Sequence, residues 1–414
     1  MKYHLPTISQ FATLLIFNIT NAIFQLVLIQ ILVHHSDPNK LGAYFIALSF
    51  SVLLSIFVNF GTGQTALVEI RKSNNKVDYP RIIQETMLLR ALPMVIAVII
   101  SCIVTMLFSN GLYYLLVLPM VIAEFFNPQF YLIATYQVKK YTIYNFLFKA
   151  IVVAIVVLCK DQNYLVEITL ITTGIAMLFL NLFFMPYRYW KQEGEGMTSS
   201  SRWMELVKTN MLVVGNGITV HLQQALFLFS LPAFVTPIFL SAYGLIDKLI
   251  SSFRMLVNAY SSAVMPYAAG THHVGFTKWK KLKQQQNYIL SAICITAGVI
   301  MYLFPSELLT ILFMGKNNHA DFFSTAVSLL KMISPVPLFI ALNVLNVTEL
   351  ILEKKFKAYF AAGVLVLLGS LLCVDAMKLG VPYFFAGYYP MVIEGLCLCI
   401  YFIIVQYFRK SNEH

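Results

Sequence analysis

Charged residues are scarce in this sequence. Asp, Glu, Lys and Arg together make up 11% of its 414 residues, whereas hydrophobic residues make up 59% and the mean hydropathy is +0.75. Soluble domains hold about 25% charged and roughly 45–50% apolar residues, so a water-soluble globule is excluded. The composition predicts an all-α protein that crosses a lipid bilayer many times.

The motifs of soluble catalysis are also missing. The sequence holds no Walker phosphate-binding loop, no HExxH and no pair of carboxylates on one helix face. Its six cysteines lie in or beside apolar runs, where we interpret them as packing residues and not as disulfides or metal ligands. We therefore expect no cofactor, no metal and no enzymatic activity. Without an ATP site, transport would use an ion gradient, the membrane potential or the substrate's own gradient.

Apolar stretches of about 20 residues predict the membrane spans. The first stretch, residues 11–33, is too long for the apolar region of a signal peptide and lacks a small-x-small cleavage site, so we expect it to remain in the protein. Twelve spans are expected in all, at 11–33, 41–68, 83–108, 112–136, 142–159, 164–186, 206–231, 237–266, 286–304, 325–351, 358–377 and 381–407.

Lysine and arginine are distributed unevenly between the segments that connect these spans. Twenty of the 29 fall on one side of the predicted membrane, while the other side holds Lys40, Lys160, Lys316 and Lys378. By the positive-inside rule, both termini are cytoplasmic and the number of spans is even. Membrane topology then explains most of the formal charge of +11, and no nucleic-acid partner is expected.

The polar segment 187–205 lies near the middle of the chain. We predict an N-terminal six-helix lobe at 1–190, a cytoplasmic linker at 191–205 and a C-terminal six-helix lobe at 206–414. Short matches six spans apart indicate that the lobes are parallel repeats around a central cavity. Leu41-Gly-Ala-Tyr44 matches Leu240-Ser-Ala-Tyr243, and Asn18, Asn21 and Gln25 match Asn216, Thr219 and Gln223.

The predicted span 237–266 has an unusual polar stripe. Asp247, Ser251, Arg254, Asn258 and Ser261 recur at helical spacing, while the opposite face is apolar. A charged side chain inside the bilayer usually faces a water-filled cavity and has a function. The alternative is a structural stripe whose side chains hold neighbouring helices by hydrogen bonds. The functional interpretation is favoured because no acid at i±3 or i±4 neutralises Arg254.

Other polar residues in the spans are candidates of unequal strength. Arg90 lies close to a polar stretch and fits an interfacial position as well as a cavity. Asp247 and Glu124 are the most deeply placed acids and the candidates for ion coupling, although Asp247 could simply balance Arg254 or Lys248. Glu349 and Glu394 are weaker candidates. The residues expected to line the cavity are Asn18, Asn21, Gln25, Asn59, Asn216, Gln223, Ser251 and Asn258.

The spans, the repeats and three short segments resemble a known family. The segments are Leu41-Gly42-x-Tyr44, Asn59-Phe60-Gly61 and Met265-Pro266. With them the chain resembles a Wzx-type O-antigen flippase of the multidrug/oligosaccharidyl-lipid/polysaccharide (MOP) exporter superfamily. The resemblance implies a V-shaped, two-lobed fold that moves an undecaprenyl-diphosphate-linked oligosaccharide from the cytoplasmic to the periplasmic leaflet.

The resemblance also implies roles for residues and partners. Arg254, Lys248 and Arg90 would receive the diphosphate, and the amides and hydroxyls of the cavity would receive the sugar. The glycan would be a lipopolysaccharide O-antigen or a capsule repeat unit. A polysaccharide polymerase and a chain-length regulator are the expected protein partners.

Three alternatives remain open. A cation-coupled multidrug exporter of the same fold would have mostly acidic residues in its cavity. A membrane-embedded polysaccharide polymerase would need a large periplasmic loop, which is not predicted here. A purely structural membrane protein would leave the polar stripes unexplained. The chain also departs from peptidoglycan-precursor flippases, because it has twelve predicted spans and no arginine in the first two.

Overall fold

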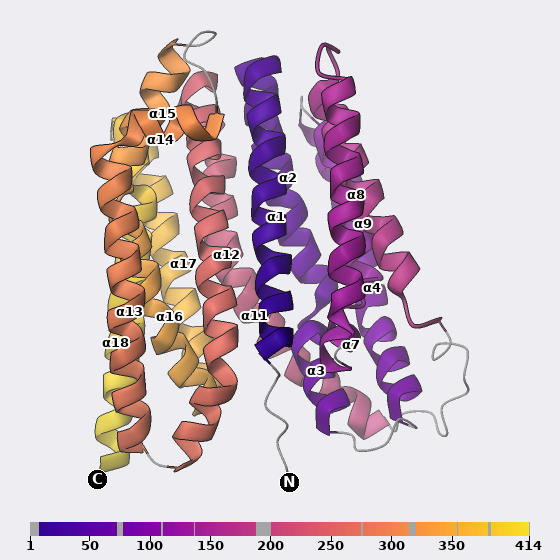
Figure 1. The fold of residues 1–414 in the computed structure, drawn as a ribbon, viewed down its shortest axis with the longest axis vertical. Coiled ribbons are helices and arrows are strands. Elements are labelled where there is room, and N and C mark those ends of the chain that lie inside the picture. Colours follow the sequence, from indigo (N-terminus) through magenta and orange to yellow (C-terminus); the bar gives the residue numbers. More distant parts are fainter. Residues whose placement is uncertain are drawn as a thin grey trace. The chain divides into compact units, whose positions relative to one another are not determined.

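The computed structural model describes residues 8–72, 78–108, 111–135, 137–187, 200–274, 276–313, 320–353, 355–379 and 382–413. Every regular element in these ranges is an α-helix or a short 3-10 helix (Figure 1). This result confirms the predicted all-α class. Helices suit an apolar chain in lipid because they satisfy all backbone N–H and C=O groups within one segment.

Ten segments of the described residues are long and apolar enough to cross a membrane, and a bent pair of helices makes an eleventh. The bend of 45° separates α15 (Ala320–Met332) from α16 (Val336–Leu352). The polar-striped helix α12 (Pro237–Val274) is not among these segments, but it forms one continuous helix of 38 residues. The ten are α1 (Ile8–His35), α2 (Pro38–Asn59), α4 (Tyr79–Leu107), α8 (Val138–Leu158), α9 (Leu165–Phe184), α11 (Ser200–Ser230), α13 (Phe276–Leu303), α17 (Phe356–Lys378), α18 (Tyr389–Glu413) and the segment Leu112–Ala134.

Two predicted spans are interrupted. The span expected at 41–68 ends at Asn59, because Phe60 and Gly61 have φ of +50° and +73° and turn the chain. Residues beyond the turn form a separate helix, α3 (Thr62–Lys72). The span expected at 112–136 consists of α5 (Leu112–Leu116), α6 (Leu118–Phe125) and α7 (Gln129–Ala134), with Pro128 at the second break.

The chain forms two compact units. The N unit comprises residues 43–221, and the C unit comprises residues 1–42 with 222–414. By its contacts, α1 thus groups with the C-terminal helices, and the first two thirds of α11 group with the N-terminal ones. The lobe boundaries at 190 and 206 stay a prediction, and most of the 191–205 linker lies outside the described residues.

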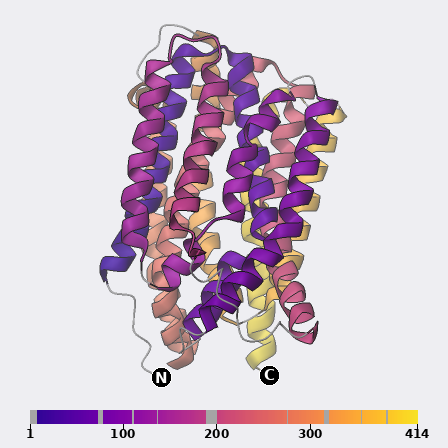
Figure 2. The ribbon, with the colours of Figure 1, turned by 90° about the vertical axis from the view of Figure 1, so that its right-hand side faces the viewer.

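In the N unit, α9 packs against both α6 and α8, and α3 packs against α4 and α7. The long helices of this unit run roughly alongside one another (Figure 2). Gly61 lies against α11, since a β-carbon added there would be 3.0 Å from the carbonyl oxygen of Asn210. Thr65 on α3 also donates to the Asn210 side chain at 2.7 Å. These contacts hold the start of α11 in the N unit.

In the C unit, α12 packs against α1, α13, α15 and α16, while α18 packs against α16 and α17. The first turn of α1 and the last turn of α18 lie at the same end of this unit (Figure 1). The segments that begin at Leu41 and Leu240, which match in sequence, lie close together in this unit. A β-carbon on Gly42 would lie 3.0 Å from the Leu240 side chain, and the Ser241 hydroxyl donates to the Pro38 carbonyl.

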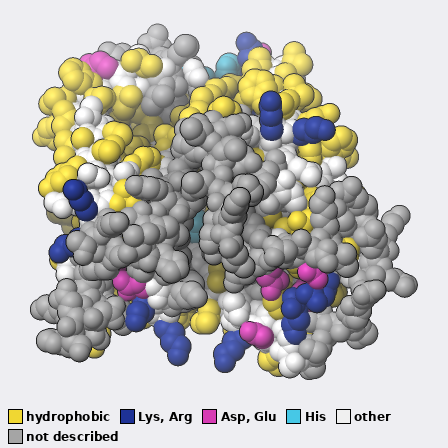
Figure 3. Space-filling model, turned by 60° about the horizontal axis from the view of Figure 1, so that its bottom comes forward, with side chains coloured by type: hydrophobic (Ala, Val, Ile, Leu, Met, Phe, Trp, Pro, Cys, Tyr) yellow, Lys and Arg dark blue, Asp and Glu magenta, His cyan; other side chains and the backbone are white. Residues whose placement is uncertain are grey.

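The surface has the composition of a membrane protein. In Figure 3, hydrophobic side chains cover much of the side wall, and charged side chains gather toward the end that faces the viewer. The exposed large residues on the helices are mostly Leu, Ile, Val and Phe. Such a surface is stable in lipid and not in water, so the chain is a multi-pass membrane protein.

Candidate functional site

The length of α12 leaves room for both a membrane span and an extension beyond it. Its 38 residues measure about 57 Å at 1.5 Å per residue, whereas the hydrocarbon core is about 30 Å thick. The residues of the predicted stripe all lie on this one uninterrupted helix. Its charged members Asp247 and Arg254 lie two turns apart and face a pocket within the C unit.

Arg254 forms an ion pair with Glu394 of α18. The Nε and Nη2 atoms of Arg254 donate to the same carboxylate oxygen, Oε1, at 3.1 and 2.7 Å. The side chains are 19% and 10% exposed. The sequence shows no local counter-ion for Arg254, and it makes Glu394 only a weak candidate. The structure places the counter-ion on another helix, 140 residues away.

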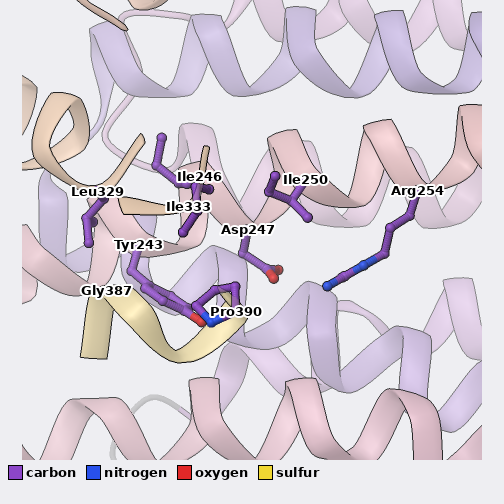
Figure 4. A pocket seen from close by; sticks show the side chains of 9 residues that line it. All are labelled: Tyr243, Ile246, Asp247, Ile250, Arg254, Leu329, Ile333, Gly387 and Pro390. Carbon is purple, nitrogen blue, oxygen red and sulfur yellow. The ribbon is translucent and has the colours of Figure 1, made fainter. Parts of the chain in front are cut away.

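The pocket next to this pair combines apolar walls with three polar groups (Figure 4). The side chains of Asp247 and Arg254 point toward one another in that view. Beside them, Lys248 is buried, with its Nζ 3.6 Å from Oδ2 of Asp247. The lining residues come from α12, from α15 and the residue that follows it, from the short helix η3 (Tyr383–Tyr388) and from the start of α18. They are Tyr243, Ile246, Asp247, Ile250, Arg254, Leu329, Ile333, Gly387 and Pro390.

Hydrogen bonds and stacked rings surround the pocket. The Tyr389 ring stacks on Phe227 with centroids 3.5 Å apart, and its hydroxyl donates to the Gln223 carbonyl at 2.6 Å. One turn beyond Glu394, Cys397 accepts a hydrogen bond from Asn343 at 3.3 Å. The start of α18 is thereby fixed against α11 and α16, and with it the position of Glu394.

The other residues predicted to line a cavity have different surroundings. Ser251, Asn18, Asn21 and Gln25 are half-buried, and the last three lie on α1, which packs against α12. Gln223 is buried, and among the described residues its Oε1 atom has no hydrogen-bond partner. The side chains of Asn216 and Asn258 lie outside what the structure describes.

Arg90 lies inside the N unit and is 1% exposed. Its Nε donates to the Thr62 hydroxyl at 2.7 Å, and its Nη1 lies 3.2, 3.2 and 3.0 Å from the carbonyl oxygens of Glu124, Phe125 and Asn127. Pro128 has no N–H, so the carbonyls at the end of α6 lack their usual helical partners. The guanidinium of Arg90 supplies the missing donors. The role of Arg90 in binding the diphosphate stays a prediction.

Glu124 and Asn59 belong to the same buried network. The Asn59 amide donates to Oε1 of Glu124 at 2.5 Å, and Asn127 donates to both carboxylate oxygens at 3.1 and 3.0 Å. The Gly63 N–H donates to the Asn59 side chain at 3.0 Å. These bonds join the turn after α2 to the break between α6 and α7. The coupling role of Glu124 and the cavity role of Asn59 stay predictions.

A second buried ion pair was missed in the sequence. Lys283 is one of the twenty lysines and arginines predicted to lie on the cytoplasmic side, and its side chain is buried on α13. Its Nζ lies 2.8 Å from Glu349 and 2.7 Å from Asn346, and the Trp279 indole donates to the same glutamate at 3.2 Å. The spacing of Asn346 and Glu349 on one face of α16 is the signal that could have indicated this cluster. Its members satisfy one another, which is typical of a structural role.

Comparisons with known proteins identify the fold. No family model matches the sequence, and no curated protein matches it. The lipid II flippase MurJ in an inward closed conformation matches with a TM-score of 0.71 and 13% identity over 96% of this chain and 87% of that one. The MATE multidrug transporter DinF-BH matches with a TM-score of 0.67 and 12% identity over 96% of this chain and 94% of that one.

A MOP superfamily transporter from Pyrococcus furiosus also matches, with a TM-score of 0.64 and 9% identity over 97% of this chain and 94% of that one. At these identities the comparisons show the fold and not the substrate. The chain therefore shares the fold of these three transporters.

Proposed function

We propose that this chain, folded as a MOP superfamily transporter, is a flippase for an anionic, lipid-linked oligosaccharide. The substrate is an undecaprenyl-diphosphate-linked O-antigen or capsule repeat unit. It moves by alternating access from the cytoplasmic to the periplasmic leaflet of the bacterial inner membrane, with both termini of the chain in the cytoplasm. A polysaccharide polymerase and a chain-length regulator act beside it.

The observation that supports this proposal is Arg254 beside the pocket of the C unit. A guanidinium presents donors in a planar fork that suits two oxygens of a phosphate. Among the described residues, no protein group bonds to Nη1 of Arg254, so this edge of the fork remains available to a ligand. Lys248, six residues earlier on the same helix, adds a second positive charge.

The sugar needs a different set of contacts. Amide side chains donate and accept hydrogen bonds, and α1 presents Asn18, Asn21 and Gln25 along a helix that packs against α12. The polyprenyl tail needs no polar site, because it can stay in the bilayer while the head group crosses.

One observation favours a cation-coupled multidrug exporter as the second candidate. The two acids Asp247 and Glu394 match the two cations Lys248 and Arg254 in number, so the charged residues of this site sum to zero. An acid in such a pocket could bind a proton, a sodium ion or a cationic substrate. In our proposal, Asp247 is instead the coupling residue of the flippase.

Reconstituted liposomes distinguish these two functions. A fluorescent undecaprenyl-diphosphate oligosaccharide is placed in the outer leaflet, and its protection from a membrane-impermeant quencher is followed with time. Uptake of a lipophilic cationic dye is measured in the same vesicles. We expect flipping of the diphosphate lipid above the rate of protein-free vesicles. Dye transport without diphosphate flipping would support the exporter instead.

A further inference from the structure

We propose that Glu394 is a resident counter-anion of Arg254 and determines which anions the site accepts. A phosphate group must displace the Glu394 carboxylate from Arg254, and the displaced carboxylate then takes up one proton from water. The inference rests on the function proposed above and adds to it a specificity-determining residue and a linkage between substrate binding and protonation.

The geometry of the pair leads to this inference. Both donors that Arg254 gives to Glu394 converge on Oε1, at 3.1 and 2.7 Å. The pair is therefore not the parallel arrangement in which two nitrogens meet two oxygens. Among the described residues, no bond is formed by Oε2 of Glu394 or by Nη1 of Arg254. An entering phosphate can thus bind Nη1 first and replace Glu394 second.

The charge of the site explains why a proton accompanies the exchange. With all groups ionised, Asp247, Lys248, Arg254 and Glu394 sum to zero, so the empty site does not attract an anion strongly. If a phosphate takes Arg254, Glu394 loses its counter-ion while it remains 10% exposed. An unpaired carboxylate in such surroundings is strongly disfavoured, and protonation removes its charge.

Among the side chains that the structure describes, the neighbours of Glu394 provide no other strong cation. On its own helix the nearest titratable groups are Tyr389, Cys397 and Tyr401, and α12 contributes Tyr243 besides the charged residues above. Leu329 of α15 and Ile333, which follows that helix, present apolar side chains to the pocket. Helix α16 presents the amide of Asn343 to Cys397. Further away, Glu349 of α16 is paired with Lys283, and Asp375 of α17 is paired with Lys378.

The exchange has a consequence for energetics. The proton and the anion occupy the site together, so they cross the membrane in the same direction. A diphosphate with two negative charges and one proton still moves net negative charge outward. An inside-negative membrane potential favours that movement. Proton uptake at Glu394 therefore reduces the contribution of the membrane potential to export but does not cancel it.

Calorimetry on the purified full-length protein in detergent tests the exchange. The probes are geranylgeranyl diphosphate and geranylgeranyl monophosphate, titrated at neutral pH in two buffers that differ in ionisation enthalpy. The difference between the two heats gives the number of protons taken up. For the wild type we expect uptake of about one proton per diphosphate and a preference for diphosphate over monophosphate.

The Glu394→Gln variant keeps the size of the side chain and removes the charge. We expect it to bind the diphosphate at least tenfold more tightly, to take up about one proton fewer and to lose part of its preference over the monophosphate. Glu167→Gln is the matched control, because Glu167 is a hydrogen-bonded acid of the N unit that accepts from Tyr113 at 3.0 Å. Its affinity and proton uptake should equal those of the wild type.

The outcomes separate the two proposals. Absence of diphosphate binding in the wild type and in Glu394→Gln would contradict the proposed function itself. Wild-type binding without proton uptake would overturn the exchange while leaving the function intact, and this measurement needs no variant. Equal or weaker binding by a folded Glu394→Gln protein would have the same meaning.

Discussion

Arg254 and Glu394 meet across α12 and α18 through a single carboxylate oxygen, which accepts from both Nε and Nη2 of the arginine. Arg254 is the residue proposed to bind the substrate phosphate. Glu394 is the counter-anion proposed to pair with Arg254 until the phosphate displaces it. Both side chains are mostly buried, so each depends on the other for its charge to be tolerated.

Removing one partner of this pair should destabilise the C unit. Glu394→Ala leaves Arg254 without its counter-ion. Breaking a fully buried pair costs about 3–5 kcal/mol, and this pair is partly exposed, so we expect the free energy of unfolding to fall by about 1–3 kcal/mol. The double variant Arg254→Leu with Glu394→Leu should recover most of the loss. Thermal unfolding in detergent measures both. A double variant less stable than Glu394→Ala would contradict this account.

Arg90 should be important for stability more than for recognition. Arg90→Ala removes donors to three carbonyls and one hydroxyl in a buried place, where each unsatisfied group costs about 1–3 kcal/mol. We expect a much reduced level of folded protein in the membrane, with Arg90→Lys intermediate. Normal protein level with lost export would instead support the predicted role of Arg90 in binding the diphosphate.

The turn after α2 should require glycine at position 61. Gly61 has a φ of +73°, and a β-carbon there would lie 3.0 Å from both the Asn210 carbonyl oxygen and the Val213 side chain. We expect Gly61→Ala to lower stability by about 1–3 kcal/mol. Gly395→Ala is the matched control, because its nearest neighbour, the Phe339 ring, is at 3.7 Å. Equal unfolding temperatures for the two variants would contradict the strained turn.

Asp247 should influence how transport depends on ions. It shares the pocket with Arg254 and has Lys248 as its nearest cation at 3.6 Å. If it binds the coupling ion, Asp247→Asn should reduce export and flatten its dependence on pH or sodium. The measurement is export in energised cells at several pH values and sodium concentrations. An unchanged dependence would exclude coupling through this residue.

The sequence predicted the fold class and most membrane spans better than it predicted where individual helices end. The all-α class and most spans follow from apolar runs, because in lipid a long apolar segment has few alternatives to a helix. The end of α2 is also present in the sequence as Asn59-Phe60-Gly61, although the predicted span continued past it to Val68. Hydropathy reports burial in lipid and does not report backbone dihedral angles.

The candidate site was predicted only in part. Asp247 and Arg254 were identified because their helical spacing is local information. Their surroundings depend on contacts between distant segments, such as Arg254 with Glu394, and no periodicity encodes these. Arg90 was an ambiguous candidate for the same reason, because its partners are backbone carbonyls that become available where Pro128 breaks a helix.

Export of the glycan by Arg254 variants tests the central claim most directly. In a strain that lacks the native gene, surface glycan is quantified together with the amount of each variant in the membrane. Loss of charged hydrogen bonds worth about 1.5–3 kcal/mol each should reduce export by Arg254→Ala at least tenfold. Arg254→Lys should restore it partly, because lysine keeps the charge and loses the fork. Lys378→Ala, at a 61% exposed position, should export normally, whereas full export by a normally expressed Arg254→Ala protein would contradict the account.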